Sequence, residues 1–371
     1  MGLAAWARLL VAALVGLGML VVVPLGLGLI AGGGGWPLRR RWVWFAGAVP
    51  GAVSLWLPRG PLATGLAAAY LAVALVLAAG APRWLLRGKF TEASVAPAVA
   101  GWRGWLVRGD LAVATALVTP AIAGAALVAE RAGLRLFGFR LDTLALTEAH
   151  FHYAGFAAAL VAGLVAGGGG RAGRAAALAV PGGTLIVLAG FFLGKWVEFA
   201  GAAVLTAGMW LAAWAARRSA RGGDRAARLL LTVSGVVLAA TMLLALDWAA
   251  GHVMPVPHLS LTWMAATHGV ANALGFALCT LLAWRRLRST GPGPRAAGPV
   301  APGFGSAGAG AEAGAPRGPL GLDVDRAAGE AVVLDERALD QAAGFALARD
   351  VGGSGAGGGN GEVVDGVLEH P

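Results

Sequence analysis

Long apolar runs separated by short clusters of arginine, glycine or proline form the main pattern of this chain. Several runs reach roughly 20 residues, the length that a helix needs to cross the hydrocarbon core of a bilayer. The sequence therefore predicts an all-α bundle of transmembrane helices, about nine in number. The predicted spans are approximately 9–31, 42–58, 61–80, 110–130, 145–167, 175–194, 197–216, 226–250 and 259–284.

Two features refine these spans. The stretch 175–216 is too long for one membrane helix and predicts a tight turn near Gly194 and Lys195. Proline residues fall inside three spans, at Pro50, Pro120 and Pro181, where we expect interruptions. Interrupted helices line some transport sites, but proline is also common in ordinary membrane helices, so a packing kink is the favoured interpretation.

Residues 289–371 differ in kind from the spans before them. They are rich in glycine, alanine and proline, a composition that cannot bury enough apolar surface to fold. We therefore expect two parts, a transmembrane helical domain at 1–288 and a mostly disordered cytoplasmic tail at 289–371. One island in the tail, at about 328–349, has the pattern of an amphipathic helix.

The overall composition supports a membrane protein. Hydrophobic residues make up 58% of the chain, charged residues only 13%, and the mean hydropathy is +0.72. A soluble domain carries about 25% charged residues. The lipid bilayer is therefore the principal partner. The single cysteine, Cys279, excludes an intrachain disulfide and a cysteine-based metal site.

The net charge of +10 does not indicate a nucleic-acid partner. Residues 1–288 hold 24 Lys and Arg against 8 Asp and Glu, whereas 289–371 hold 5 against 11. The basic residues lie in short loops and form no basic stripe with interleaved aromatic residues. They divide 18 to 5 between alternate loops, which predicts an outer N-terminus and a cytoplasmic C-terminus. One predicted outer loop is an exception, because it holds Arg131, Arg135 and Arg140.

Titratable residues inside the spans are the candidate functional groups. The stretch LTEAHFHYAGF (146–156) places a glutamate and two histidines at the start of an apolar helix. Such groups are costly in a bilayer and usually face a cavity, pair up or bind a ligand. We predict a polar site in the outer half of the bundle, built from Glu148, His150, His152, Glu198 and His268, with Lys195 and Asn272 as supporting residues.

Spacing along the helices refines this site. Glu148 and His152 are four residues apart and share a helix face, and so are His268 and Asn272. His150 points roughly away from His152 in a regular helix. The stretches TEAHFHYAGF (147–156) and THGVANALGF (267–276) also show a weak sequence similarity to each other. They lie on two helices that are predicted to run in the same direction.

The residues leave three interpretations of the site open. Imidazole and carboxylate groups suit zinc, iron, manganese or copper, and two histidines on separate helices suit a haem. The same groups suit a pathway for protons or a small solute. They also suit a structural network that ties helices together. Whether the protein is an enzyme stays open, because catalysis at a metal needs an open coordination position.

Three motifs resemble a known family. The segments HFHYAGF (150–156), GKWVEFAGA (194–202) and HGVANALGF (268–276) are similar to those of the YndJ-like family of bacterial membrane proteins. The resemblance covers roughly 140–285. It implies a multi-pass protein of the bacterial cytoplasmic membrane, and it implies no particular reaction, cofactor or ligand.

Overall fold

Helices form every regular element that the structure describes. The computed structural model describes residues 3–30, 38–87, 109–168, 170–221 and 223–290. The elements along these ranges, with η for π- or 3-10-helical segments, are α1 (Ala5–Leu17), η1 (Gly18–Val22), α2 (Val23–Ile30), α3 (Leu38–Ser54), α4 (Pro61–Ala78), α5 (Gly80–Arg87), α7 (Asp110–Arg131), η2 (Leu136–Gly138), α8 (Leu141–His150), η3 (Phe151–Ala157), α9 (Ala158–Gly168), α10 (Gly170–Leu193), α11 (Lys195–Ser219), α12 (Arg225–Gly251), α13 (Leu261–Met264), η4 (Ala265–Gly269), η5 (Ala271–Leu278) and α14 (Cys279–Thr290). The predicted all-α fold is confirmed. Residues 291–371, including the predicted helix at 328–349, lie outside the described ranges.

Eight continuous helices in the described ranges are long and apolar enough to cross a bilayer, with lengths of 22 to 29 residues. They are Ala5–Ile30, Pro61–Leu85, Asp110–Arg131, Leu141–Gly168, Gly170–Leu193, Lys195–Ser219, Arg225–Gly251 and Leu261–Ser289. The remaining predicted span, 42–58, corresponds to α3. This helix has 17 residues and lies at the short end of the spanning range. The chain is therefore a multi-pass membrane protein. Its orientation in the membrane stays a prediction.

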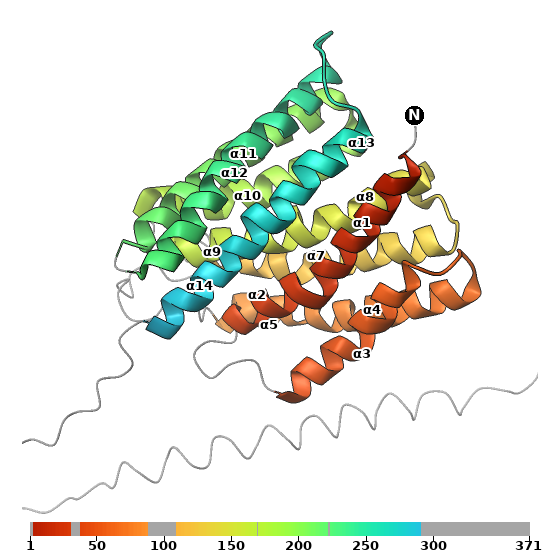
Figure 1. Ribbon diagram of the computed structural model, residues 1–371, viewed down its shortest axis with the longest axis horizontal. Coiled ribbons are helices and arrows are strands. Elements are labelled where there is room, and N and C mark those ends of the chain that lie inside the picture. The colour runs from red at the N-terminus through yellow and green to blue at the C-terminus, as the bar shows by residue number, and fades with distance from the viewer. Residues whose placement is uncertain (1–2, 31–37, 88–108, 169, 222, 291–371) are drawn as a thin grey trace, which may run out of the picture. The chain divides into compact units, whose positions relative to one another are not determined.

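The long helices run side by side in one bundle (Figure 1). Helices α3 and α4 lie toward one edge, and α11 and α12 lie toward the other. The helix Leu141–Gly168, made of α8, η3 and α9, is the most buried of the eight, with 83% of its most apolar stretch buried. It contacts α1, α7, α10 and α11, so we call it the central helix. The central helix carries three of the predicted site residues.

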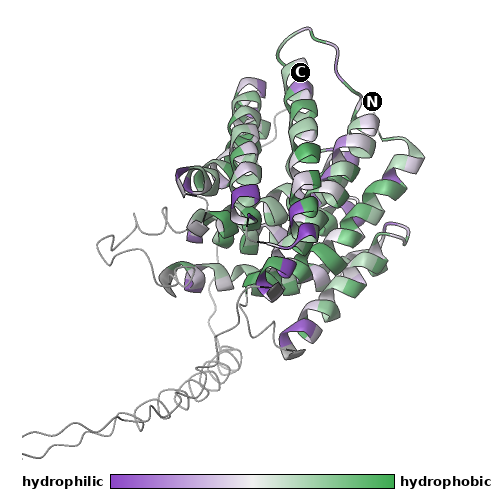
Figure 2. Ribbon diagram, turned by 60° about the vertical axis from the view of Figure 1, so that its left-hand side comes forward, coloured by the Kyte–Doolittle hydropathy of each residue, from purple (hydrophilic) through white to green (hydrophobic). Residues whose placement is uncertain are grey.

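The outer surface of the bundle is apolar. Large hydrophobic side chains are exposed on many helices, among them Leu62, Val76, Leu185 and Val236, each at least 60% exposed. Figure 2 shows that most residues along the helices are apolar. A soluble monomer rarely exposes so much contiguous apolar surface. Lipid chains are the partner that this surface fits.

The tight turn predicted near Gly194 and Lys195 is confirmed. Helix α10 ends at Leu193 and α11 begins at Lys195, so one residue joins two antiparallel helices. Gly194 has φ +119°, a backbone conformation that side chains other than glycine's rarely allow. The turn also brings Gly190 so close to Glu198 that an added methyl group would overlap with its backbone. Close backbone approach through small residues is typical of membrane helices.

The helices are irregular at positions other than those predicted. Helices α3, α7 and α10 continue through Pro50, Pro120 and Pro181. These helices do not end at proline, which agrees with the favoured interpretation of the prolines as packing positions and not with interrupted helices. The irregular turns are instead the π-helical segments η1, η3, η4 and η5, and η1, η3 and η5 contact one another inside the bundle. The two stretches that resemble each other in sequence both contain π-helical turns.

Several helix ends meet at one end of the bundle. Helices α1, α8 and α13 begin at this end, and α10 turns into α11 there. Ring contacts between Trp6 and Trp263 and between Phe139 and Phe191 connect these helix ends. We call it the first end. In the predicted orientation it faces outward.

Candidate functional site

His152 lies fully buried in the central helix, with both ring nitrogens in hydrogen bonds. Its Nδ1 lies 2.6 Å from the backbone oxygen of Glu148, which can only accept, so Nδ1 carries the proton and donates. The other nitrogen, Nε2, is then bare and accepts from the hydroxyl of Tyr70 at 2.6 Å. These bonds define a neutral His152 in one tautomer.

Three other helices close around this histidine. The ring of Tyr70, from α4, lies stacked on that of His152 at 5.8 Å between centroids. Trp44, from α3, packs edge-on against Tyr70 and donates from Nε1 to the backbone oxygen of Met19. Gly18, at the start of η1, lies against the His152 side chain, and a methyl group there would come within 2.7 Å of it. Position 18 therefore accommodates only glycine, because the backbone of η1 lies directly against this histidine.

Glu148 lies one turn nearer the first end and is 1% exposed. Its Oε1 is buried and makes no hydrogen bond with any described residue. The charged groups close enough to act on it are Glu130, Arg131 and Arg59. Glu148 is therefore a buried acid with an unpaired oxygen, close to a cluster of charged residues.

That cluster joins α7 to the turn between α3 and α4. Glu130 is 1% exposed and accepts from Arg59 Nε at 2.9 Å and Arg59 Nη2 at 2.6 Å. It also accepts from Arg131 Nε. Arg131 Nη1 in turn donates to the backbone oxygens of Ser54 and Leu57. Glu130 thus pairs with Arg131 at the end of its own helix and with Arg59 from the neighbouring turn.

His268 and Asn272 form a second closed network with Thr241 of α12. His268 Nδ1 donates to the backbone oxygen of Thr241 at 2.8 Å, and Asn272 Nδ2 donates to His268 Nε2 at 3.1 Å. The Thr241 hydroxyl donates to Asn272 Oδ1 at 2.9 Å. The predicted shared face of His268 and Asn272 is confirmed. Both nitrogens of His268 are occupied, as they are in His152.

His150 points away from His152, as its spacing predicted. It is exposed, its ring packs edge-on against Phe151 at 6.0 Å, and it lies within electrostatic range of His268. The structure thus places His150 on a different face of the central helix from Glu148 and His152.

Glu198 belongs to a third group at the first end. Its Oε1 lies 3.9 Å from His252 Nδ1. The ring of His252 packs on Trp248 at 4.1 Å and lies 5.9 Å from the ring of His258. Burial lowers the pKa of His252, and the positive charges of Lys195 and His258 lower it further. Lys195 therefore acts on His252 at this end, away from the central helix.

The five predicted ligands thus divide among three places. In the described part of the chain, no three His, Cys, Asp or Glu side chains are grouped so that they could hold one metal ion. A metal or a haem at His152 or His268 would have to replace a hydrogen bond at a ring nitrogen. The metal and haem interpretations therefore need a rearranged interior.

Comparison with known proteins identifies the family. The family model described as YndJ-like protein matches residues 13–276. The chain belongs to the YndJ-like family. No curated protein and no solved structure matches this YndJ-like chain.

The family match extends farther than the sequence motifs indicated. It begins at residue 13 and includes η1, α3, α4 and α7, whereas the resemblance covered roughly 140–285. The N-terminal helices of this YndJ-like protein supply Gly18, Trp44 and Tyr70, all of which lie at His152. The family region therefore includes the complete surroundings of His152.

Sequence reasoning missed Tyr70 and Thr241 in this YndJ-like protein. Tyr70 had a usable signal, because the chain has only two tyrosines and Tyr70 lies in the middle of a span. Tyrosines of membrane helices favour the interface, so one at mid-span needs a buried partner. Thr241 had no such signal, since its contribution to His268 is a backbone oxygen.

Proposed function

We propose that this protein is a membrane transporter that moves protons, with Glu148 as the group that carries them. The observation behind the proposal is the buried Oε1 of Glu148, which makes no hydrogen bond with any described residue. Ionisable side chains inside a membrane bundle are expensive and commonly belong to proton relays. A carboxyl group suits this role because it holds a proton as a neutral acid and releases it as an anion.

The hydrogen bonds of His152 and His268 narrow the choice of the group that carries the proton. His152 and His268 each use both ring nitrogens, one as donor and one as acceptor. A ring held in this way positions the helices that it connects. Glu148 is the titratable group of the central helix that combines full burial with an unpaired oxygen. The proposal therefore gives Glu148 the proton and the two histidines a positioning role.

Charged neighbours supply a route from the first end. Glu130, Arg59 and Arg131 lie between that end and Glu148, close enough to act on its charge. The two arginines favour the anionic form of Glu148, and Glu130 opposes it. These charged side chains therefore lie within electrostatic range of Glu148 at the end of the bundle toward which its proton would leave.

The π-helical segments around the site support a moving interior. Segments η1, η3 and η5 contact one another, and His152 lies in η3. A π-helical turn is wider than an α-helical turn and occurs frequently at functional sites. Alternating access requires helices that shift against each other around the binding position. Irregular turns at this depth are places where such a shift costs little.

The test is proton flux in vesicles. The full chain is reconstituted in liposomes that contain a pH-sensitive dye, and a potassium diffusion potential drives protons inward. We expect faster acidification than in protein-free liposomes, and we expect Glu148→Gln to abolish the difference. Glu198→Gln is the matched control, because it makes the same chemical change at the first end, next to His252.

Two results would overturn the proposal. One is a wild-type rate equal to that of protein-free liposomes. The other is a Glu148→Gln rate equal to that of the wild type. Thermal unfolding in detergent verifies that each variant is folded before its flux is compared.

A further inference from the structure

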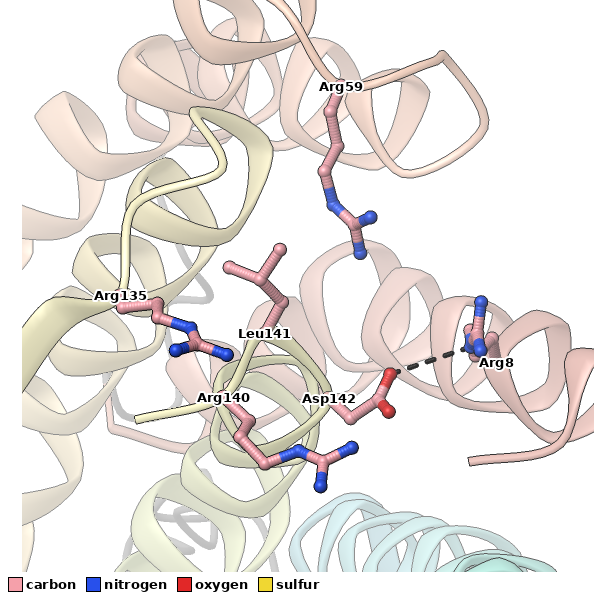
Figure 3. A pocket seen from close by; sticks show the side chains of 6 residues that line it. All are labelled: Arg8, Arg59, Arg135, Arg140, Leu141 and Asp142. Atoms are coloured by element: carbon pink, nitrogen blue, oxygen red, sulfur yellow. Dashed lines mark ion pairs between the residues drawn. The ribbon is translucent and has the colours of Figure 1, made fainter. Parts of the chain in front are cut away.

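Four arginines surround a pocket at the first end of the bundle (Figure 3). Its volume is about 260 Å³, and its lining consists of Arg8, Arg59, Arg135, Arg140, Leu141 and Asp142. The arginines come from different elements: α1, the turn before α4, the connection between α7 and η2, and the residue before α8. Segments far apart in the sequence thus bring positive charge to one small opening.

The pocket carries more positive charge than its acids balance. Asp142 is the only acid in the lining, and its Oδ1 lies 3.5 Å from Arg8 Nε. Arg59 shares Glu130 with Arg131, so that group also has one positive charge in excess. The side chains of Arg135 and Arg140 are exposed and make no hydrogen bond or ion pair with other described residues. Both guanidinium groups are therefore available to a ligand.

Exposed aromatic side chains at this end of the bundle are of the kind found at the level of lipid headgroups. Phe137 is 73% exposed, Phe192 57% and Trp196 65%, and the rings of Phe137 and Phe192 contact each other. Phe137 has φ 52°, a left-handed conformation that is uncommon for a phenylalanine. Aromatic residues are enriched at the interface between membrane and water. Arg135 and Arg140 flank Phe137 in sequence, so they reach the same level.

We propose that this pocket binds a phosphate group. Guanidinium groups form paired hydrogen bonds to the oxygens of phosphate and carboxylate. A planar carboxylate offers two oxygens in one plane, whereas a tetrahedral phosphate offers oxygens in several directions. Arg135 and Arg140 offer guanidinium groups free of ion pairs, and the paired Arg8 and Arg59 add positive charge from two further elements, an arrangement that fits the tetrahedral anion better. The pocket is smaller than the roughly 300–1,000 Å³ of drug-sized sites, as expected for a headgroup or a free phosphate ion.

A ligand-binding role also accounts for the charge of this loop. In the predicted orientation the first end faces outward, where arginine is disfavoured in short loops. Arg135 and Arg140 are exceptions to that rule. Binding of a phosphate group gives these positions a function that does not depend on proton movement through Glu148.

The experiment compares two sources of the phosphate group. Purified full-length protein in detergent is titrated with dioctanoyl phosphatidylglycerol in one arm and with inorganic phosphate in the other, and its tryptophan fluorescence and thermal unfolding are recorded. The variant is Arg135→Gln/Arg140→Gln. The control is Arg171→Gln/Arg174→Gln, which removes the same charge from exposed positions at the start of α10, the opposite end of the bundle.

We expect saturable binding of at least one ligand, weakened roughly tenfold or more by Arg135→Gln/Arg140→Gln and unchanged by the control. Binding of the lipid alone identifies a headgroup, and binding of inorganic phosphate identifies a free anion. Absence of saturable binding in both arms overturns the proposal. Equal weakening by the control pair also overturns it, because the effect would then be one of net charge alone.

Discussion

The hydroxyl of Tyr70 donates a hydrogen bond to Nε2 of His152 at 2.6 Å, inside the bundle and 82 residues away in the sequence. Because the other ring nitrogen donates to a backbone oxygen, this bond leaves the ring neutral and fixed in one tautomer. The contact connects α4 to the central helix. Glu148 lies one turn earlier on that helix, and its backbone oxygen accepts from the same ring.

Tyr70→Phe should therefore destabilise the protein by about 1–3 kcal/mol, since it leaves a buried ring nitrogen without a partner. The comparison is Tyr153→Phe. Tyr153 donates to the backbone oxygen of Leu14, which keeps its bond from the backbone of Gly18 when the hydroxyl is removed. Unfolding in detergent should show the larger loss for Tyr70→Phe. Equal losses would mean that the Tyr70 hydroxyl contributes no more than an ordinary bond.

Gly18→Ala should also destabilise the protein, by about 1–3 kcal/mol, because overpacking forces neighbouring groups apart. The new methyl group would lie within 2.7 Å of the His152 side chain. Gly16→Ala is the matched control, since nothing lies within 4 Å of a methyl group there. It should be neutral or slightly stabilising, as alanine favours the helix. A stable Gly18→Ala would show that η1 moves away from η3 at little cost.

The membrane architecture could be predicted from the sequence because each span is a local property. A run of about 20 apolar residues predicts a helix without knowledge of its neighbours. Gly194 was equally informative, because the apolar segment around it is too long for one helix. The prolines left two interpretations open, since packing in the bundle decides whether a helix continues through Pro120 or Pro181.

The site could be predicted only in part. Spacing on one helix correctly paired His268 with Asn272, and it placed Glu148 next to His152. The partner helices could not be derived from spacing, so Tyr70 was missed, and the position of Glu198 next to His252 was not foreseen. Contacts between helices depend on three-dimensional packing, which the sequence of one helix does not contain.

Metal analysis is expected to find no stoichiometric metal or haem in protein purified without a histidine tag. The reason is geometric, because the ring nitrogens of His152 and His268 are already in hydrogen bonds. Treatment with a chelator should leave the unfolding temperature unchanged. The expectation would be contradicted by one equivalent of a transition metal in the wild type that is lost in His152→Ala/His268→Ala. That result would support the cofactor interpretation.

Glu130→Gln should be among the most damaging single changes, at about 3–5 kcal/mol, because it removes one partner from a buried ion cluster. The variant leaves Arg59 and Arg131 facing each other without the carboxylate between them. Asp142→Asn serves as the control, since Asp142 meets the more exposed Arg8 at 3.5 Å. Its cost should stay below about 1 kcal/mol, as for other surface pairs. Similar costs for both variants would mean that the Glu130 cluster is effectively open to water.

His252 should make the stability of the protein depend on pH near neutrality. Its pKa is lowered in the folded state by burial and then by the charges of Lys195 and His258, and these effects outweigh the attraction of Glu198 at 3.9 Å. The unfolded chain therefore takes up a proton first as the pH falls below about 6.5. The free energy of unfolding should decrease from there until the pH has passed the folded pKa.

His252→Gln should reduce this slope, because it removes the group whose pKa differs between the two states. Lys195→Gln should reduce it as well, since it removes one of the charges that lower the pKa of His252. Unfolding temperatures measured in detergent at about pH 7.5 and about pH 5.5 give the slope for each protein. A slope that stays the same in both variants would mean that other histidines carry the pH dependence. A steeper slope in Lys195→Gln would mean that the lysine charge does not lower the pKa of His252.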